Sequence, residues 1–270
     1  MSGRIPIHHL DAFTRRPFGG NPAAVCPLER WLDERTMQAI AAENQVAETA
    51  FFVGGQGRYA IRWFTPAAEV DLCGHATLAS AHVVFERMEP ALREVRFDSK
   101  SGELSVRRRE GGLLELDFPA RAPESVPMPA TVAAAFGRPA REAWRSRDLM
   151  LVYESEAEVR ALVPDFAAIA GLSDFGVIVT APGDTVDFVS RFFAPRKGVP
   201  EDHATGSAHC TLTPYWAKRL GKMRLEARQI SPRGAELFCT LAGDRVLIAG
   251  HVAPYLEGTI TIDQPEHATP

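Results

Sequence analysis

The chain has 270 residues, of which 46% are hydrophobic and 24% charged, and its formal net charge is −4. This length suits one large domain or two small ones, and the scattered Lys and Arg residues give no basic footprint for nucleic acid. No apolar run approaches the roughly 20 residues of a membrane helix, and the first residues lack the apolar segment of a signal peptide. We therefore expect a cytoplasmic protein with neither a nucleic-acid nor a membrane partner.

The first half of the chain alternates helical and strand-like patterns. Asp33 can cap an amphipathic helix, and runs of β-branched and aromatic residues between turn residues indicate strands. The expected elements are a helix over residues 32–43, strands over 48–54 and 59–65, a helix over 75–88, and a meander of strands over 95–118.

The second half repeats this order of elements. The expected elements are a helix over residues 159–170, strands over 175–181 and 186–193, a helix over 206–220, and strands over 230–243, 244–252 and near 258–262. Four prolines between Pro119 and Pro129 cannot continue a helix or an inner strand. We therefore expect an N-terminal lobe of residues 1–120, a linker over 119–129 and a C-terminal lobe of 130–270, with a tail able to return to the first lobe.

Similar phrases recur about half a chain length apart. Residues 73–82 read CGHATLASAH and residues 201–210 read EDHATGSAHC, so that His75 and His203 are 128 positions apart. Arg62 and Arg191 begin the similar phrases RWFTP and RFFAP, 129 positions apart. Matches in one register predict an internal duplication, in which His75 and His203 coincide.

The duplication indicates an α+β fold of two pseudo-symmetric lobes. The strand-rich pattern predicts a mostly antiparallel sheet in each lobe, rolled around a central helix rich in Ala and Ser. Because ligand sites favour domain interfaces, we expect a cleft between the lobes to hold the substrate.

The starts of the two central helices are candidate anion sites. A helix N-terminus exposes unpaired N–H groups and a partial positive charge, and glycine permits close approach of the backbone. We expect Gly74 and Ala76, together with Thr205, Gly206 and Ser207, to bind a small carboxylate. Alternatively, Gly and Ser only cap and pack these helices.

Three titratable side chains are candidate catalytic groups. Glu48 lies at the mouth of a strand, while His75 and Asp202 lie near the two helix starts. This set suits general acid–base chemistry in a dry cleft. Taken singly, Glu48 can be a solvated strand-end carboxylate, His75 a core or capping residue, and Asp202 an N-cap.

Other chemistries have little support. The chain has neither a dinucleotide-binding nor a P-loop glycine motif, and no nucleophile elbow. Its four cysteines, Cys26, Cys73, Cys210 and Cys239, form no C-x-x-C pair, so we expect reduced, buried thiols. His75 and His82 share a helical face without a third regularly spaced ligand, and we expect no metal and no organic cofactor.

Several segments carry a resemblance to a known family. Residues 11–25 (DAFTRRPFGGNPAAV), the NQVAETAFF and RWFTPAAEVDLCGHATLASA segments, and EDHATGSAH resemble the signature segments of the PhzF-like family of phenazine biosynthesis. The similarity covers nearly the whole chain in the right order.

The resemblance implies a diaminopimelate-epimerase-like fold and a cofactor-free isomerase, usually homodimeric. It implies that Glu48 is the catalytic glutamate, that His75 and Asp202 are site residues, and that Ser207 closes the second site segment. The expected reaction shifts a proton on a small unsaturated or cyclic carboxylate, as in trans-2,3-dihydro-3-hydroxyanthranilate isomerase.

This sequence departs from the family pattern at two places. NQVAET has one more residue between Asn and Glu than the family segment, and His203 stands where the family often has Pro. The alternatives are an amino-acid epimerase or racemase, which would need a second group opposite Cys73, and a binding protein without turnover. The sequence leaves the substrate and the role of Cys73 open.

Overall fold

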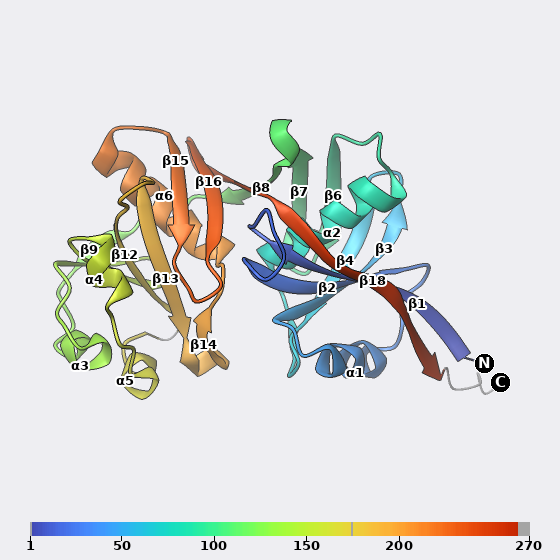
Figure 1. Cartoon of the computed structure of the whole chain (residues 1–270), viewed down its shortest axis with the longest axis horizontal. Helices are drawn as coiled ribbons and strands as arrows, with labels where there is room; N and C mark the ends of the chain where they lie inside the picture. Colours follow the sequence, from blue (N-terminus) through green and yellow to red (C-terminus); the bar gives the residue numbers. More distant parts are fainter. Residues whose placement is uncertain (1, 174, 264–270) are drawn as a thin grey trace. The chain divides into compact units, whose positions relative to one another are not determined.

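The computed structural model describes residues 2–173 and 175–263 as a sheet-dominated α+β structure (Figure 1). The described residues divide into two units. Unit 1 draws its residues from Met1–Pro17, Pro22–Leu114 and Val252–Pro270, and unit 2 from Phe18–Asn21 and Glu115–His251. No helix in the described part of the chain is long and apolar enough to cross a membrane.

The described part of the first unit contains two α-helices, two shorter helical segments and strands from both ends of the chain. Its elements are β1 (Ser2–Ala12), β2 (Asn21–Leu28), α1 (Glu34–Asn44), β3 (Glu48–Gly55), β4 (Arg58–Phe64), β5 (Glu69–Val70), α2 (Gly74–Val83), the π-helix η1 (Val84–Met88), β6 (Glu94–Ser99), β7 (Gly102–Arg108), the 3₁₀ turn η2 (Glu110–Gly112) and β18 (Val252–Asp263). Strand β18 pairs antiparallel with β1 over nearly its whole length.

The chain enters the second unit through β8. The elements that follow are β8 (Leu114–Pro119), β9 (Glu124–Val126), α3 (Val132–Phe136), β10 (Glu142–Arg145), β11 (Leu149–Val152), α4 (Glu156–Arg160), α5 (Phe166–Ala170), β12 (Val177–Pro182), β13 (Phe188–Ala194), the 3₁₀ turn η3 (Pro195–Lys197), β14 (Val199–Asp202), α6 (Gly206–Leu220), β15 (Arg224–Gln229), β16 (Ala235–Ala242) and β17 (Arg245–Gly250). The proline-rich segment between positions 119 and 129 includes β9, which pairs antiparallel with β10.

The two units pair their strands in the same order. In unit 1, β3 lies parallel to β2 and antiparallel to β4, which lies parallel to β6, and β6 lies antiparallel to β7. In unit 2, β12 lies parallel to β11 and antiparallel to β13, which lies parallel to β15, and β15 lies antiparallel to β16. This shared topology supports the internal duplication.

Equivalent ion pairs strengthen this relationship. Nε of Arg62 lies 2.7 Å from Oε1 of Glu69 on β5, and Nε of Arg191 lies 2.8 Å from Oε1 of Glu201 on β14. Each guanidinium also lies over the ring of the phenylalanine two residues further along its strand. The RWFTP and RFFAP phrases therefore fill the same structural role.

The two HAT phrases do not take equivalent places. His75 is the second residue of α2, whereas His203 precedes the first residue of α6, Gly206. The expectation that these histidines coincide is wrong, because Arg191 and Glu201 are ten positions apart whereas Arg62 and Glu69 are seven apart. The additional residues lie in the stretch that contains η3 and the start of β14. The residue that matches His75 at the start of its helix is Ser207.

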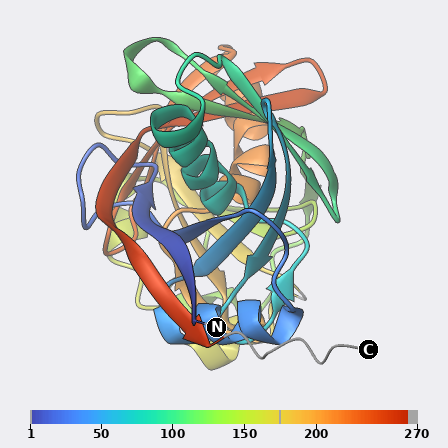
Figure 2. The same ribbon diagram turned by 90° about the vertical axis from the view of Figure 1, so that its right-hand side faces the viewer.

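The central helix of unit 1 is buried on nearly all sides. Eight of the ten residues of α2 are buried, and the helix contacts β1, β3, β7 and β18 (Figure 2). Small side chains such as Ala76, Ala79 and Ala81 let strands approach the helix closely. A helix that is apolar all round belongs in a core rather than on a surface.

The central helix of unit 2 has the bounds that the sequence predicts, and it contains a proline. Pro214 has no N–H to donate to the carbonyl of Cys210. That carbonyl instead accepts a hydrogen bond of 2.9 Å from the backbone N–H of Arg121. Pro214 therefore leaves a carbonyl free to hold the loop between β8 and β9, which contains Arg121, against the helix.

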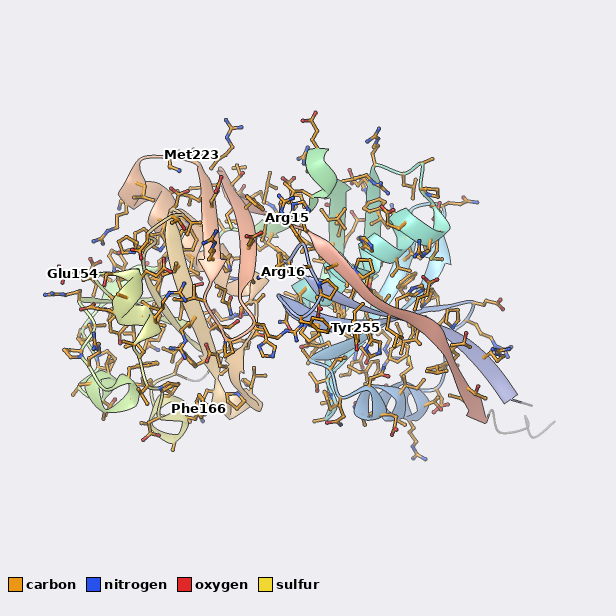
Figure 3. All side chains as sticks on the ribbon, viewed as in Figure 1. Arg15, Arg16, Glu154, Phe166, Met223 and Tyr255 are labelled. Carbon is orange, nitrogen blue, oxygen red and sulfur yellow. The ribbon has the colours of Figure 1, made fainter. Side chains whose placement is uncertain are left out.

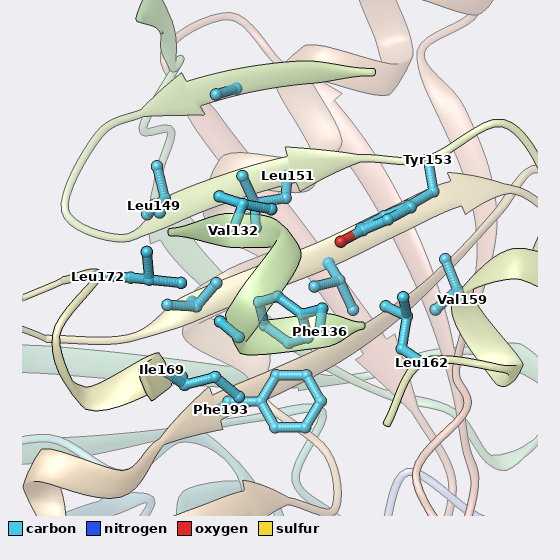
Figure 4. Close-up of a cluster of buried hydrophobic side chains, with 14 of the residues drawn as sticks. Val132, Phe136, Leu149, Leu151, Tyr153, Val159, Leu162, Ile169, Leu172 and Phe193 are labelled. Carbon is cyan, nitrogen blue, oxygen red and sulfur yellow. The ribbon is translucent and has the colours of Figure 1, made fainter. Parts of the chain in front are cut away.

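The helix expected over residues 159–170 is two short helices, α4 and α5. Pro164 disfavours a helical conformation for the residue before it, and Asp165 caps a new helix by accepting from the N–H groups of Ala167 and Ala168. Both helices cover the apolar cluster shown in Figure 4, in which Phe136 and Phe193 pack with their ring centroids 5.5 Å apart.

Large apolar side chains on the surface are scattered. Phe166, Met223 and Tyr255, labelled in Figure 3, are 40%, 61% and 57% exposed and lie on different segments. Single exposed apolar residues of this kind are ordinary in globular proteins.

Candidate functional site

Glu48 is held at the start of β3 by the loop that follows α1. The helix ends at Asn44, and its C-cap residue Gln45 has a φ of 51°, which turns the chain towards the strand. Nδ2 of Asn44 donates to Oγ1 of the buried Thr49 at 3.1 Å, which ties the helix end to the strand start. The Glu48 side chain is 19% exposed, so this carboxylate is largely shielded from water.

His75 faces Glu48 from the start of α2. Its Nε2 lies 3.0 Å from Oε2 of Glu48, and its Nδ1 lies 3.5 Å from Sγ of Cys73, the residue that precedes the helix. The ring is 8% exposed. Contacts on both nitrogens fix the orientation of the imidazole.

The environment favours the protonated form of both Cys73 and His75. Burial raises the pKa of the Cys73 thiol, and the charge of Glu48 raises it further. For His75, burial is the largest influence and disfavours the imidazolium, but the neighbouring Cys73 and Glu48 outweigh it. The pKa of His75 is therefore raised well above its ordinary value, and the ring forms an ion pair with Glu48.

The same three residues could hold a metal ion. Glu48, Cys73 and His75 each offer one donor atom, and these atoms lie within 4.8 Å of one another. Carboxylate, thiolate and imidazole are all zinc ligands. However, Cys73 and Glu48 contact different nitrogens of the ring, so an ion bound by all three would require a side chain to turn.

Asp202 belongs to a separate network in unit 2. Its carboxylate accepts from Nδ2 of Asn21 at 2.8 Å and from Oγ1 of Thr205 at 2.5 Å. Gln229 completes the network by donating to the Asp202 carbonyl at 2.8 Å and accepting from the Thr205 N–H at 2.8 Å. These bonds fix Asp202 just before the start of α6.

The predicted carboxylate-binding residues lie at the two helix starts. In unit 1, Gly74 and Ala76 begin α2, and the buried Ala76 amide faces the Cys73 thiol. In unit 2, Thr205 is the N-cap of α6, and Gly206 and Ser207 are its first two residues. Unpaired N–H groups at such positions can receive an anion.

The structure adds residues that the sequence alone does not assign to a site. Asn21, which orients Asp202, lies within one of the segments that carry the family resemblance. Gln229 ends a strand of alternating pattern and gives no separate signal. Arg147 donates to Oγ of Ser207 at 3.0 Å, and only its position beside Asp148, directly before the apolar run of β11, marks it in the sequence.

Comparisons with known proteins decide the family. The family described as "Phenazine biosynthesis-like protein" matches residues 10–258. The chain belongs to this family. An uncharacterized isomerase of Pseudomonas aeruginosa is 51% identical over 95% of this chain and 98% of that protein. The human phenazine biosynthesis-like domain-containing protein is 40% identical over 96% of this chain and 99% of its own.

Solved structures from inside and outside the family have a similar fold. A PhzF-family protein of Enterococcus faecalis is 47% identical and has a TM-score of 0.93, with 96% of this chain and 99% of that chain covered. A hydroxyproline epimerase of Agrobacterium vitis with bound trans-4-hydroxy-L-proline is 10% identical, with a TM-score of 0.61 over 97% of this chain and 94% of its own. The second similarity shows the fold alone.

Proposed function

We propose that this PhzF-family protein is a cofactor-independent isomerase that shifts a proton on a small unsaturated or cyclic carboxylate. The observation that carries the proposal is the shielded contact between Glu48 and His75 at the start of α2. Relatives named as isomerases support the reaction class. The proposed substrate class is that of trans-2,3-dihydro-3-hydroxyanthranilate.

Glu48 is the proposed base and acid of the reaction. Its carboxylate takes a proton from one carbon, the electron pair moves through the unsaturated system, and the same carboxylate returns a proton to another carbon. His75 holds a proton beside Glu48, and the N–H groups near Gly74 and Ala76 stabilise the negative charge that develops. Since no electrons leave the substrate, the reaction needs no redox partner.

The second unit supplies the remaining proposed roles. Asp202, oriented by Asn21 and Thr205, holds or relays a proton. The backbone at Gly206 and Ser207 binds a carboxylate oxygen. We further propose a homodimer, which the resemblance to the family implies, and a cytoplasmic location, which is the expectation from the sequence.

A two-thiol epimerase fits the residues less well. Cys73 precedes α2, but the N-cap at the equivalent place before α6 is Thr205. A hydroxyl hydrogen-bonded to Asp202 is a much weaker acid than a thiol. Cys210 lies inside α6 and is 2% exposed, so it does not take the place of a second thiol.

Deuterium transfer tests the proposed function. The wild-type protein is incubated with trans-2,3-dihydro-3-hydroxyanthranilate in D₂O, and the product is followed by ultraviolet absorbance and proton NMR. We expect the double bonds to shift and deuterium to enter the carbon that receives the proton. Binding without any turnover or exchange would favour the binding-protein alternative, and inversion at one carbon without a double-bond shift would favour an epimerase.

A further inference from the structure

A charged cluster in unit 2 fixes one arginine beside the start of α6. Arg147 donates through Nη2 to Oγ of Ser207 at 3.0 Å and to Oδ2 of Asp148 at 2.9 Å. Its guanidinium lies over the ring of Phe175, 3.9 Å from the centroid. A side chain held on three sides loses little freedom when it binds a ligand.

This cluster stands where unit 1 has its Glu48–His75 pair. Strand pairing matches Thr49 with Val177, so the residue equivalent to Glu48 is Gly176. A Cβ atom at Gly176 would lie 3.2 Å from Oδ1 of Asp148. The Asp148 carboxylate therefore borders the equivalent position, and Arg147 contacts Ser207, the counterpart of His75.

The cluster carries more positive than negative charge. Asp148 is fully buried, and burial raises its pKa while Arg147 and Arg121 act to lower it. Nη1 of Arg121 is a buried atom without a hydrogen-bond partner among the described residues. Lys197 adds a further cation, with Nζ 5.5 Å from the ring centroid of Phe175. The cluster thus contains one carboxylate and three cations.

Arg147 retains capacity for an additional anion. Its side chain is 26% exposed, and its hydrogen bonds to Asp148 and Ser207 use Nε and Nη2, leaving Nη1 without a partner in the described part of the chain. The two N–H groups of Nη1 can donate charge-assisted hydrogen bonds, which are stronger with a carboxylate than with a neutral group.

We propose that Arg147 binds the carboxylate of the substrate, next to Ser207, and sets the preference for anionic over neutral ligands. This inference rests on the proposed function in that it names how the same substrate is recognised. Asp148 and Phe175 position the guanidinium, and Arg121 and Lys197 supply the excess charge that attracts the anion.

Two probes of nearly equal shape test the proposal. Anthranilate carries a carboxylate on an aromatic ring, and anthranilamide carries a neutral amide in the same place. Calorimetry measures the binding of both to wild type and to Arg147→Met. We expect the variant to bind anthranilate roughly 10- to 100-fold more weakly, as for the loss of hydrogen bonds to a charged group, with anthranilamide unaffected.

Control variants separate recognition from folding and from turnover. Arg145→Met removes an equal charge from an exposed position on β10 and should leave both affinities unchanged. Arg147→Lys keeps a charge beside Asp148 and should give an intermediate affinity. If circular dichroism shows that Arg147→Met does not fold, the Arg147→Met/Asp148→Asn double variant, which removes both charges of the ion pair, is measured instead.

The outcomes distinguish this proposal from the proposed function. Weaker binding of anthranilate alone supports the role of Arg147 even if wild type does not isomerise trans-2,3-dihydro-3-hydroxyanthranilate. The role of Arg147 is overturned if wild type does not prefer anthranilate, or if Arg147→Met keeps that preference. If wild type has isomerase activity and Arg147→Met still prefers anthranilate to anthranilamide, the proposed function is supported and the role of Arg147 is refuted.

Discussion

Oε2 of Glu48 and Nε2 of His75 lie 3.0 Å apart within unit 1, although Glu48 is the first residue of a strand and His75 is the second residue of a helix. The strand start is tied to α1 through Asn44 and Thr49, and the ring is held on its other side by Cys73. The positions of β3 and α2 therefore hold the Glu48 and His75 side chains in contact. Fixing two reacting groups before the substrate binds lowers the entropic cost of the reaction.

Replacing Glu48 by Gln should remove proton transfer while it keeps the shape of the side chain. General acid–base catalysis is typically worth about 10²–10⁴-fold, so we expect kcat with trans-2,3-dihydro-3-hydroxyanthranilate to fall by about that factor. Deuterium exchange into the substrate carbon should vanish, and anthranilate should still bind. Glu43→Gln, at an exposed position on α1, is the matched control. Wild-type turnover in Glu48→Gln would reduce Glu48 to a structural role.

Replacing Cys73 by Ala should change the titration of His75. Cys73 is among the influences that raise the pKa of this ring, so its removal should lower that pKa. NMR of the ring protons should show His75 losing its proton at a lower pH than in wild type, and an alkaline limit of kcat that depends on the imidazolium should move in the same direction. An unchanged NMR titration would show that Cys73 only fills space beside the ring.

We expect added Zn²⁺ to inhibit turnover and a chelator to leave turnover unchanged. The donor atoms of Glu48, Cys73 and His75 are close enough for one ion, and binding it would occupy the proposed base. Under the cofactor-independent proposal, a chelator alone leaves turnover unchanged and reverses inhibition by added Zn²⁺. Cys73→Ala should need more Zn²⁺ for the same inhibition. Loss of activity on chelation, restored by metal, would contradict the cofactor-independent proposal.

Most of what the sequence could predict about the fold came from its repeated segments. Similar side chains at Arg62 and Arg191 make similar contacts, so the duplication was visible in the sequence. The sequence did not predict correctly how His75 and His203 are related, because unit 2 has additional residues between Arg191 and Glu201, before its central helix begins. Similarity between short segments does not reveal insertions of a few residues beside them.

The network around the start of α6 could be predicted only in part. Asp202 and Ser207 stand in recognisable segments, but the partners Gln229 and Arg147 come from strands or loops distant along the chain. Their contacts depend on how the sheet of unit 2 brings these segments together. The Arg147-Asp148 pair directly before a buried strand was the one indication of this site in the sequence, because a charged residue that becomes buried requires a partner.

His209 should make the protein less stable in acid. Its ring is fully buried in α6, where Nδ1 lies 2.9 Å from the carbonyl oxygen of Thr205. Burial lowers its pKa to about 4, although the hydrogen bond to Thr205 acts in the opposite direction. The folded protein therefore keeps this ring neutral at a pH where the unfolded chain protonates it.

The sign of the effect follows from proton binding by the two states. Between the ordinary histidine pKa of about 6.5 and the folded value of about 4, the unfolded chain binds more protons, so stability falls as pH falls through this window. The loss in the free energy of unfolding is on the order of 3 kcal/mol once both states are protonated.

Urea unfolding of wild type and His209→Gln between pH 7 and about 4 measures this loss. We expect a flatter dependence in His209→Gln, and a smaller change in His9→Gln, whose ring is less deeply buried and whose pKa burial also lowers. Equal pH slopes in wild type and His209→Gln would show that this ring is not held neutral by the fold.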